Sequence, residues 1–293
     1  MTIPTLGFIG LGVMGSGMCA NVVKKHGAPV HVFDMVPAAM AEQVAGGALA
    51  ASTVADVAKA AEIIFLSLPG GKQVAAVCEE IGTHAKPGTV VVDLSTTSVA
   101  EAREIAAKLA DKGMLFADAP VARTREAAQQ GTLSIMVGAS SELFARVEPL
   151  LGYMGSDVTL CGEVGCGQVV KLVNNTLNFV HVLILAEQMV SAERAGVKPE
   201  VLLEAVSKGS GDSFILRNHG VKSMAPRVFP EKSFPPEYVL KDIGYSIELA
   251  KSMGVDPQVS LLAEKYYREA VEQGYGGRYF PAVIEMIDKG KMP

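Results

Sequence analysis

The sequence has few aromatic residues and no stretch dominated by charge of one sign. Aromatic residues make up 6% of the chain, tryptophan is absent, and the formal net charge is −5. Nucleic-acid-binding domains usually carry a basic face, often with aromatic side chains that stack on bases. We therefore expect no nucleic-acid partner, and the acidic balance argues against attachment to a membrane surface.

Cysteine is also scarce, and its positions carry no metal-type spacing. The 4 cysteines, Cys19, Cys78, Cys161 and Cys166, form no closely spaced pairs of the zinc-site kind, and the 5 histidines do not cluster with carboxylates. A chain of 293 residues can bury enough surface to fold without disulfides. The first residues lack the basic segment and apolar run of a signal peptide. We expect a reduced, cytoplasmic protein that needs no metal.

The first motif present is a glycine-rich turn between a strand and a helix. An apolar run over residues 5–10 enters Gly10-Leu11-Gly12-Val13-Met14-Gly15, and residues 18–25 have helical character. The first glycine permits a tight turn, the second lets the backbone approach a pyrophosphate, and the third lets helix and strand pack closely. The helix N-terminus offers N–H groups to phosphates. The motif predicts that these six residues bind a dinucleotide.

An acidic residue at position 34 bears on which dinucleotide is bound. A second strand, over residues 29–33, ends at Asp34, about twenty positions after the glycine turn. Its carboxylate can accept hydrogen bonds from the adenosine ribose diol and would repel a 2′-phosphate. No arginine follows it directly. The sequence predicts NAD as cofactor, with NADP disfavoured but possible.

Two further apolar strands, over residues 63–68 and 89–94, end at Leu68-Pro69 and before Thr96. In a parallel sheet the ligand lies beyond the carboxyl ends of the strands, so Leu68, Pro69 and Thr96 are predicted to line the cofactor crevice. The alternative is that they are ordinary turn residues.

A long segment without proline, residues 165–196, organises the rest of the chain. Lys171, Asn174, Asn175 and Asn178 follow helical spacing and form one narrow polar stripe, while the surrounding residues are apolar. A helix that is apolar nearly all round is normally buried, so we interpret the stripe as a buried site. The alternative is an ordinary solvated face. The polar residues argue against a membrane span.

The chain divides at this segment. Strands alternate with helices before it, up to strands over 114–118 and 133–137 and a helix over 140–151, and only helices follow residue 196. We predict an α/β fold with a Rossmann-type domain over 1–162, a linking helix over 163–196 and an all-α domain over 197–293. In the last, Lys241-Asp242 can be either a site or a solvated helix face.

The motifs together resemble the β-hydroxyacid dehydrogenases, the group of 3-hydroxyisobutyrate dehydrogenase and tartronate semialdehyde reductase. The resemblance is carried in order by GFIGLGVMGSGM, DAPVARTREAAQQGTL, GCGQVVKLVNN and Lys241-Asp242, and it covers essentially the whole chain. It implies that the helical domain assembles a homodimer or homotetramer. It also implies that Lys171 is catalytic, that Asn174 and Asn175 hold substrate, with Asn178 on the same stripe, and that Lys241 lies beside nicotinamide and substrate.

The chemistry of such a reaction agrees with the stripe. Oxidising a hydroxyl requires removing its proton while hydride leaves the same carbon. A lysine on an apolar helix wall is expected to have a lowered pKa and can act as the general acid and base.

One loop departs from the family pattern. Where these relatives commonly have Asp-x-Pro-x-Ser-Gly-Gly, this chain has Asp118-Ala119-Pro120-Val121-Ala122-Arg123-Thr124. A guanidinium offers two parallel hydrogen bonds to an anion, so Arg123 and Thr124 are predicted to bind the carboxylate or sulfonate of a small substrate. The loop is similar to that of the sulfolactaldehyde reductase branch. The alternative is that Arg123 pairs with Glu126 at i+3.

The sequence thus predicts an NAD-dependent oxidoreductase that interconverts a short anionic hydroxy acid and its aldehyde or ketone. Two alternatives remain open: a reductase of imines or other carbonyl analogues, and a non-catalytic NAD-binding protein. The resemblance implies that imine-reducing relatives commonly lack a lysine at the place of Lys171, and a non-catalytic protein would not need it.

Overall fold

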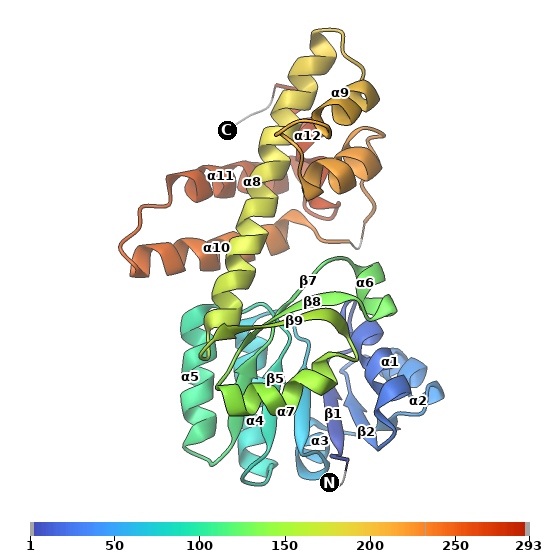
Figure 1. Ribbon diagram of the computed structural model, residues 1–293, viewed down its shortest axis with the longest axis vertical. Helices are drawn as coiled ribbons and strands as arrows, with labels where there is room; N and C mark the ends of the chain where they lie inside the picture. Colours follow the sequence, from blue (N-terminus) through green and yellow to red (C-terminus); the bar gives the residue numbers. More distant parts are fainter. Residues whose placement is uncertain (1–2, 232, 291–293) are drawn as a thin grey trace. The chain divides into compact units, whose positions relative to one another are not determined.

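The computed structural model describes residues 3–231 and 233–290. Within them the chain forms two compact units, which divide between Lys171 and Leu172. The first unit carries the strands β1 to β9, and the second is built of helices, as Figure 1 shows. The predicted α/β class, with a helical C-terminal part, is confirmed. The predicted domain limits at 162 and 196 stay predictions, because this division falls inside the linking helix.

The first unit is organised on a mixed sheet. Its order is β3-β2-β1-β4-β5-β6-β8-β7, with β9 paired to β8. The strands from β3 to β6 are parallel, whereas β8 is antiparallel to both β6 and β7. The strands are β1 (Leu6–Ile9), β2 (Val30–Phe33), β3 (Leu49–Ala50), β4 (Ile63–Leu66), β5 (Val90–Asp93), β6 (Leu115–Asp118), β7 (Val121–Ala122), β8 (Leu133–Gly138) and β9 (Gly155–Gly162).

Helices cover both faces of this sheet. Because side chains alternate along a strand, Leu6 and Phe8 pack with α1, α6 and α7, while Ile64 and Leu66 pack with α3, α4 and α5. Burial on both sides explains why the central strands are continuously apolar. The helices are α1 (Gly15–His26), α2 (Pro37–Ala45), α3 (Val54–Ala60), α4 (Gly71–His84), α5 (Val99–Ala110), α6 (Arg125–Gln130) and α7 (Ser141–Leu151).

The second unit has its own aromatic core. The ring of Phe179 makes edge contacts with Tyr267 and Phe280, and Tyr267 is fully buried. The elements are α8 (Cys166–Arg194), which begins in the first unit, α9 (Pro199–Val206), the π-helix η1 (Leu216–Met224), α10 (Pro236–Ser252), α11 (Gln258–Ala270), the π-helix η2 (Val271–Tyr275), the short 3₁₀ helix η3 (Phe280–Ala282) and α12 (Val283–Asp288).

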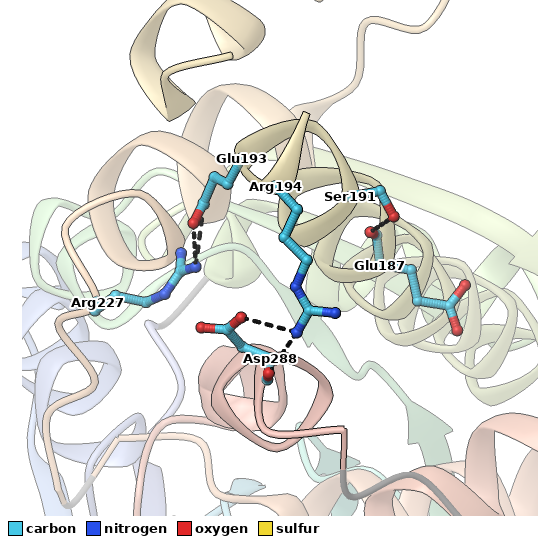
Figure 2. Close-up of polar contacts among 6 residues, drawn as sticks. All are labelled: Glu187, Ser191, Glu193, Arg194, Arg227 and Asp288. Atoms are coloured by element: carbon cyan, nitrogen blue, oxygen red, sulfur yellow. Dashed lines mark hydrogen bonds and ion pairs between the residues drawn. The ribbon is translucent and has the colours of Figure 1, made fainter. Parts of the chain in front are cut away.

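Ion pairs fasten the C-terminal end of α8 within the second unit. Figure 2 shows Arg227 donating to both carboxylate oxygens of Glu193, each at 3.0 Å. In the same view Arg194 donates to the backbone carbonyl of Asp288 at 2.6 Å and approaches its carboxylate at 3.3 Å. A cation near a helix C-terminus is favoured by the helix dipole, so both the charge and the contacts hold this end of α8.

The predicted helix over the linking segment is confirmed, but its predicted burial is wrong for one face. Val170, Val173, Leu177 and Ile184 are 40 to 54% exposed, and only 39% of the most apolar stretch is buried. These residues follow each other at three, four and seven positions, so they share one side of the helix. By length and composition α8 could cross a membrane, but a core helix of a soluble protein passes the same test.

Candidate functional site

The glycine turn contains two kinds of glycine. Gly10 has φ +93°, and a Cβ there would lie 2.2 Å from the backbone oxygen of Ser67. A Cβ at Gly15 would lie 2.1 Å from the oxygen of Gly10. The fold itself therefore requires these two. A Cβ at Gly12 would meet no protein atom within 4 Å. Since the fold does not require glycine at position 12, the open space there fits the close approach of a pyrophosphate.

Asp34 holds the glycine turn in place. One carboxylate oxygen accepts a hydrogen bond from the Leu11 amide at 2.6 Å, and the other accepts one from the Val36 amide at 2.8 Å. The first turn of α1 carries no acidic side chain, and Met14 before it makes no side-chain cap bond. The N-terminus of α1 thus keeps the donors and the favourable dipole end that an anion needs.

The sheet brings the predicted cofactor residues to one edge. Ile9, Leu66 and Asp93 are register partners at the carboxyl ends of β1, β4 and β5. The loops that follow carry the glycine turn, Leu68-Pro69 and Thr96. The Leu68 amide donates to Ser95 Oγ at 2.9 Å, which ties two of these loops together. The edge therefore has the architecture of a dinucleotide crevice, while the contacts of single residues with a cofactor stay predictions.

The polar stripe on α8 is partly buried, as predicted. Lys171 is 9% exposed and Asn175 is 6% exposed, while Asn174 and Asn178 are of intermediate exposure. An ordinary solvated face would not bury a lysine and an amide to this degree. The alternative is therefore wrong for Lys171 and Asn175.

Asp242, from the Lys241-Asp242 pair, organises the second unit's part of the stripe. Asp242 lies on α10, is 2% exposed, and accepts a hydrogen bond from Asn175 Nδ2 at 2.7 Å. Its other oxygen lies 3.3 Å from the ammonium of Lys241. Asn174 in turn donates to Asn175 Oδ1 at 3.1 Å. The reading of the Lys241-Asp242 pair as a solvated helix face is wrong for Asp242.

The loop before α6 is where the structure departs most from the sequence prediction. Arg123 donates to the Thr132 carbonyl at 2.5 Å, to Ser156 Oγ at 2.9 Å and to Asp157 at 2.7 Å. The alternative pairing is also wrong, since Glu126 accepts instead from Gln130. The Arg123 guanidinium is thus engaged by Thr132, Ser156 and Asp157, and its contact with a substrate anion stays a prediction. Pairing of β8 with β9 brings Asp157 to this loop, a contact between strands that local spacing cannot reveal.

The backbone of this loop keeps a glycine-like shape without glycine. Arg123 has φ +86°, a left-handed conformation that is uncommon for side chains with a Cβ. The contacts of its guanidinium help to hold it there. Thr124, the second predicted anion ligand, caps α6, its hydroxyl accepting from the Ala127 amide at 3.4 Å.

A second buried carboxylate, Asp118, ends β6 and holds the start of α8. It is fully buried and accepts hydrogen bonds from the amides of Gly165 at 2.6 Å and Gln168 at 2.8 Å. Burial raises the pKa of Asp118 to about 6, although both amides and the charge of Arg103 oppose the rise. Its position in the resembling loop marked Asp118, but no sequence pattern indicated its partners.

Side chains that could ligate a metal are not grouped in the described part of the chain. Over residues 3–231 and 233–290, no group of three or more histidine, cysteine, aspartate or glutamate side chains could hold a metal ion. The first unit offers a glycine turn at a helix N-terminus and a buried lysine, and in the second unit the Asn175 amide donates to a buried carboxylate.

Comparisons with known proteins agree with this arrangement over nearly the whole chain. Residues 5–162 match the family described as the NAD binding domain of 6-phosphogluconate dehydrogenase. Residues 165–287 match the family described as the NAD-binding domain of NADP-dependent 3-hydroxyisobutyrate dehydrogenase.

Individual proteins show the same likeness. The chain is 36% identical to 2-(hydroxymethyl)glutarate dehydrogenase of Eubacterium barkeri, with 97% of this chain and 95% of that protein covered. It is 33% identical to an NAD-dependent L-serine dehydrogenase of Pseudomonas aeruginosa, with 97% of each covered. The solved structure of 3-hydroxyisobutyrate dehydrogenase of Mycobacterium tuberculosis with L-serine has a TM-score of 0.87 at 28% identity, covering 98% of this chain and 99% of that one.

Proposed function

Because this chain belongs to the β-hydroxyacid dehydrogenase family, an NAD(P)-dependent group of oxidoreductases, we propose that it interconverts a short anionic hydroxy acid and its aldehyde or ketone. The cofactor is NAD and Lys171 is the general acid and base. The observation that carries this proposal is the burial of Lys171, which is 9% exposed and lies on α8 one turn before Asn174 and Asn175.

The steps assigned to this chain concern a proton and its neighbours. NAD, when bound, supplies the hydride acceptor. The Lys171 amine takes the hydroxyl proton in oxidation and returns it in reduction. Asn175 orients the substrate, and Asp242 fixes the Asn175 amide by accepting from its Nδ2. Since Asn175 donates one N–H to Asp242, its second N–H is the one we assign to substrate.

A preference for NAD over NADP follows from Asp34. Both of its oxygens already accept backbone hydrogen bonds, and each keeps a second lone pair for a ribose hydroxyl. A 2′-phosphate at the same place would face this carboxylate. Titrating NADH and NADPH into the protein and following nicotinamide fluorescence tests the preference, and equal dissociation constants would contradict it.

The substrate carries an anionic head group, carboxylate or sulfonate, which we assign to the loop that ends at Thr124; Lys241 is a separate predicted contact of substrate and cofactor. Thr124 can donate its hydroxyl proton while it accepts from Ala127. Arg123 shapes this loop through Asp157 and does not present its guanidinium to the substrate.

We further propose that the protein is a homodimer or homotetramer in a reducing, cytoplasmic setting. The exposed apolar face of α8, formed by Val170, Val173, Leu177 and Ile184, is the surface that supports assembly. The four cysteines are free, as a reducing setting requires. Light scattering of Leu177→Glu tests the assembly, because a charge on this face would shift the mass towards the monomer. An unchanged mass would contradict the assignment.

The experiment that tests the function is a substrate panel. Wild-type protein and Lys171→Ala are mixed with NAD and with L-serine, 3-hydroxyisobutyrate, 2-(hydroxymethyl)glutarate or a hydroxysulfonate, and NADH formation is followed. We expect turnover of at least one anionic hydroxy acid, lowered about 1,000-fold in Lys171→Ala. Turnover that does not depend on Lys171 would defeat the mechanism. Reduction of imines alone, or NADH binding without any turnover, would identify the two alternative functions.

A further inference from the structure

We propose that Gln168 is a positioning residue for this reaction: its side-chain amide locks the first turn of α8, and with it Lys171, to the loop after β5 that carries Thr96. The inference rests on the proposed function, since it assumes that Lys171 moves the proton and that Thr96 lines the cofactor crevice. Every residue that it uses lies within the first unit.

The Gln168 side chain is built into the loop after β5. It is fully buried, its Oε1 accepts from the Thr97 amide at 3.1 Å, and its Nε2 donates to the Ser95 carbonyl at 2.8 Å. The two contacts are on the residues either side of Thr96. One side chain therefore fixes the backbone on both flanks of a predicted cofactor contact.

The same loop is tied to the next cofactor loop. Ser95 Oγ accepts from the Leu68 amide at 2.9 Å, and the Ser95 amide donates to Asp93 at 2.9 Å. The hydrogen bonds thus run from the loop after β4, through Ser95, to Gln168 on α8. A shift of the first turn of α8 would be passed to Leu68 as well as to Thr96.

The backbone of this turn is held independently on its other side. Asp118 accepts from the amides of Gly165 and Gln168, so the strand β6 anchors the turn from which the Gln168 side chain extends. The turn also packs closely against β8, because a Cβ on Gly167 would lie 2.4 Å from the Met136 carbonyl oxygen. With the backbone fixed by β6 and the side chain fixed by the loop after β5, the turn has one position relative to both.

Lys171 is the next residue along that face. It follows Gln168 by three positions, and residues at this spacing are neighbours on a helix surface, about 4.5 Å apart along the axis. Fixing Gln168 therefore fixes the origin of the Lys171 side chain relative to the cofactor loops. Both polar ends of the buried amide are bonded to the backbone that flanks Thr96.

The test compares Gln168→Leu with wild type, using the most active substrate of the panel and a version deuterated at its carbinol carbon. Gln168→Leu removes both contacts, so we expect kcat to fall about 100-fold, as for a misplaced reacting group. We also expect the deuterium effect on kcat to increase, since hydride transfer becomes limiting. NADH affinity, followed by fluorescence, should weaken because the Leu68 and Thr96 loops lose their tie.

Two further variants separate positioning from stability. Gln168→Glu keeps the shape and the acceptor for Thr97, but its carboxylate, when ionised, turns an acceptor towards the Ser95 carbonyl, so its kcat should fall as well. Arg227→Met removes two hydrogen bonds to Glu193 at the far end of the same helix. It should lower the melting temperature without changing kcat or the deuterium effect.

The outcomes keep this inference distinct from the proposed function. If turnover depends on Lys171 while both Gln168 variants, corrected for their folded fraction, keep wild-type kcat and deuterium effect, only the positioning role is overturned. If wild type turns over no substrate, the proposed function fails, and NADH affinity then tests the link between Gln168 and the cofactor loops. Weaker NADH binding by both Gln168 variants than by Arg227→Met supports the link. Equal NADH binding by the three variants overturns it. Should Gln168→Leu not fold, Gln168→Glu carries the comparison.

Discussion

Carboxylates of the two units bind different groups. In the first unit Asp34 and Asp118 each accept hydrogen bonds from two main-chain amides. In the second unit Asp242 binds side chains, the Asn175 amide and the Lys241 ammonium. Where the backbone itself makes the contacts, added atoms do the damage, whereas a contact between side chains is lost when one of them is removed.

The largest effect is expected at Asp118, the buried carboxylate that accepts two backbone amides. The pKa of Asp118 is raised from 3.8 to about 6, so the unfolded chain loses this proton first as the pH rises. Its contribution to stability is therefore fully present below pH 3.8 and is lost as the pH rises to about 6. That range corresponds to about 3 kcal/mol. The free energy of unfolding of wild type and of Asp118→Asn is measured with urea between pH 3.5 and 7. The difference between the two proteins should fall over this range, and a difference that stays constant would contradict the prediction.

The next effect separates a glycine needed by a ligand from one needed by the fold. A Cβ on Gly12 meets no protein atom, so Gly12→Ala should keep the melting temperature. Crowding of the pyrophosphate should weaken NADH binding by about 2 kcal/mol, roughly 30-fold. Gly10→Ala should instead unfold at lower temperature, because of its positive φ and the Ser67 contact. Equal melting temperatures for the two variants would show that the distinction is mistaken.

The effect expected at the side-chain contacts of Asp242 is smaller. Asp242→Asn keeps the size of the side chain but removes the charge that holds Lys241 and weakens the acceptor for Asn175. Weakening the hydrogen bond that orients Asn175 should lower kcat/KM about 10-fold. NADH affinity should stay unchanged if Asp242 acts on the substrate alone. An effect on NADH binding with no effect on kcat/KM would place Asp242 with the cofactor.

The smallest effect is expected at Arg123. Glycine accepts φ +86° freely, and the ion pair with Asp157 is largely exposed, so Arg123→Gly should change KM less than about 2-fold. Arg123→Ala removes the same guanidinium but keeps the backbone strain, so it should be the less stable of the two. A tenfold or greater rise in KM for anionic substrates with Arg123→Gly would return the guanidinium to the substrate site.

The glycine turn and Asp34 could be predicted because the sequence patterns that indicate them are local. Gly10, Gly12, Gly15 and Asp34 lie within one strand–turn–helix–strand unit, and each strand end is marked by its own apolar run. Six of the sheet strands, β1, β2, β4, β5, β6 and β8, follow directly from such runs. β9 was missed, because Gly155–Gly162 has exposed and intermediate residues along most of its length and so no apolar run.

The contacts between distant segments could not be predicted. Asn175 and Asp242 stand 67 positions apart, and Gln168 meets Ser95 across 73. Arg123 was predicted from its charge, but its partner Asp157 is brought to it by strand pairing. The exposed face of α8 could not be predicted, because an apolar residue in a sequence does not show whether its own chain buries it.

The most direct measurement of the central claim is chemical rescue of Lys171→Ala. If the amine at position 171 moves the hydroxyl proton, added ethylamine should restore part of the lost NADH formation in proportion to its free-base concentration, while leaving wild type unaffected. NADH affinity of the variant should equal that of wild type. A variant that keeps wild-type turnover without any amine, or that loses turnover only because NADH no longer binds, would contradict the role given to Lys171.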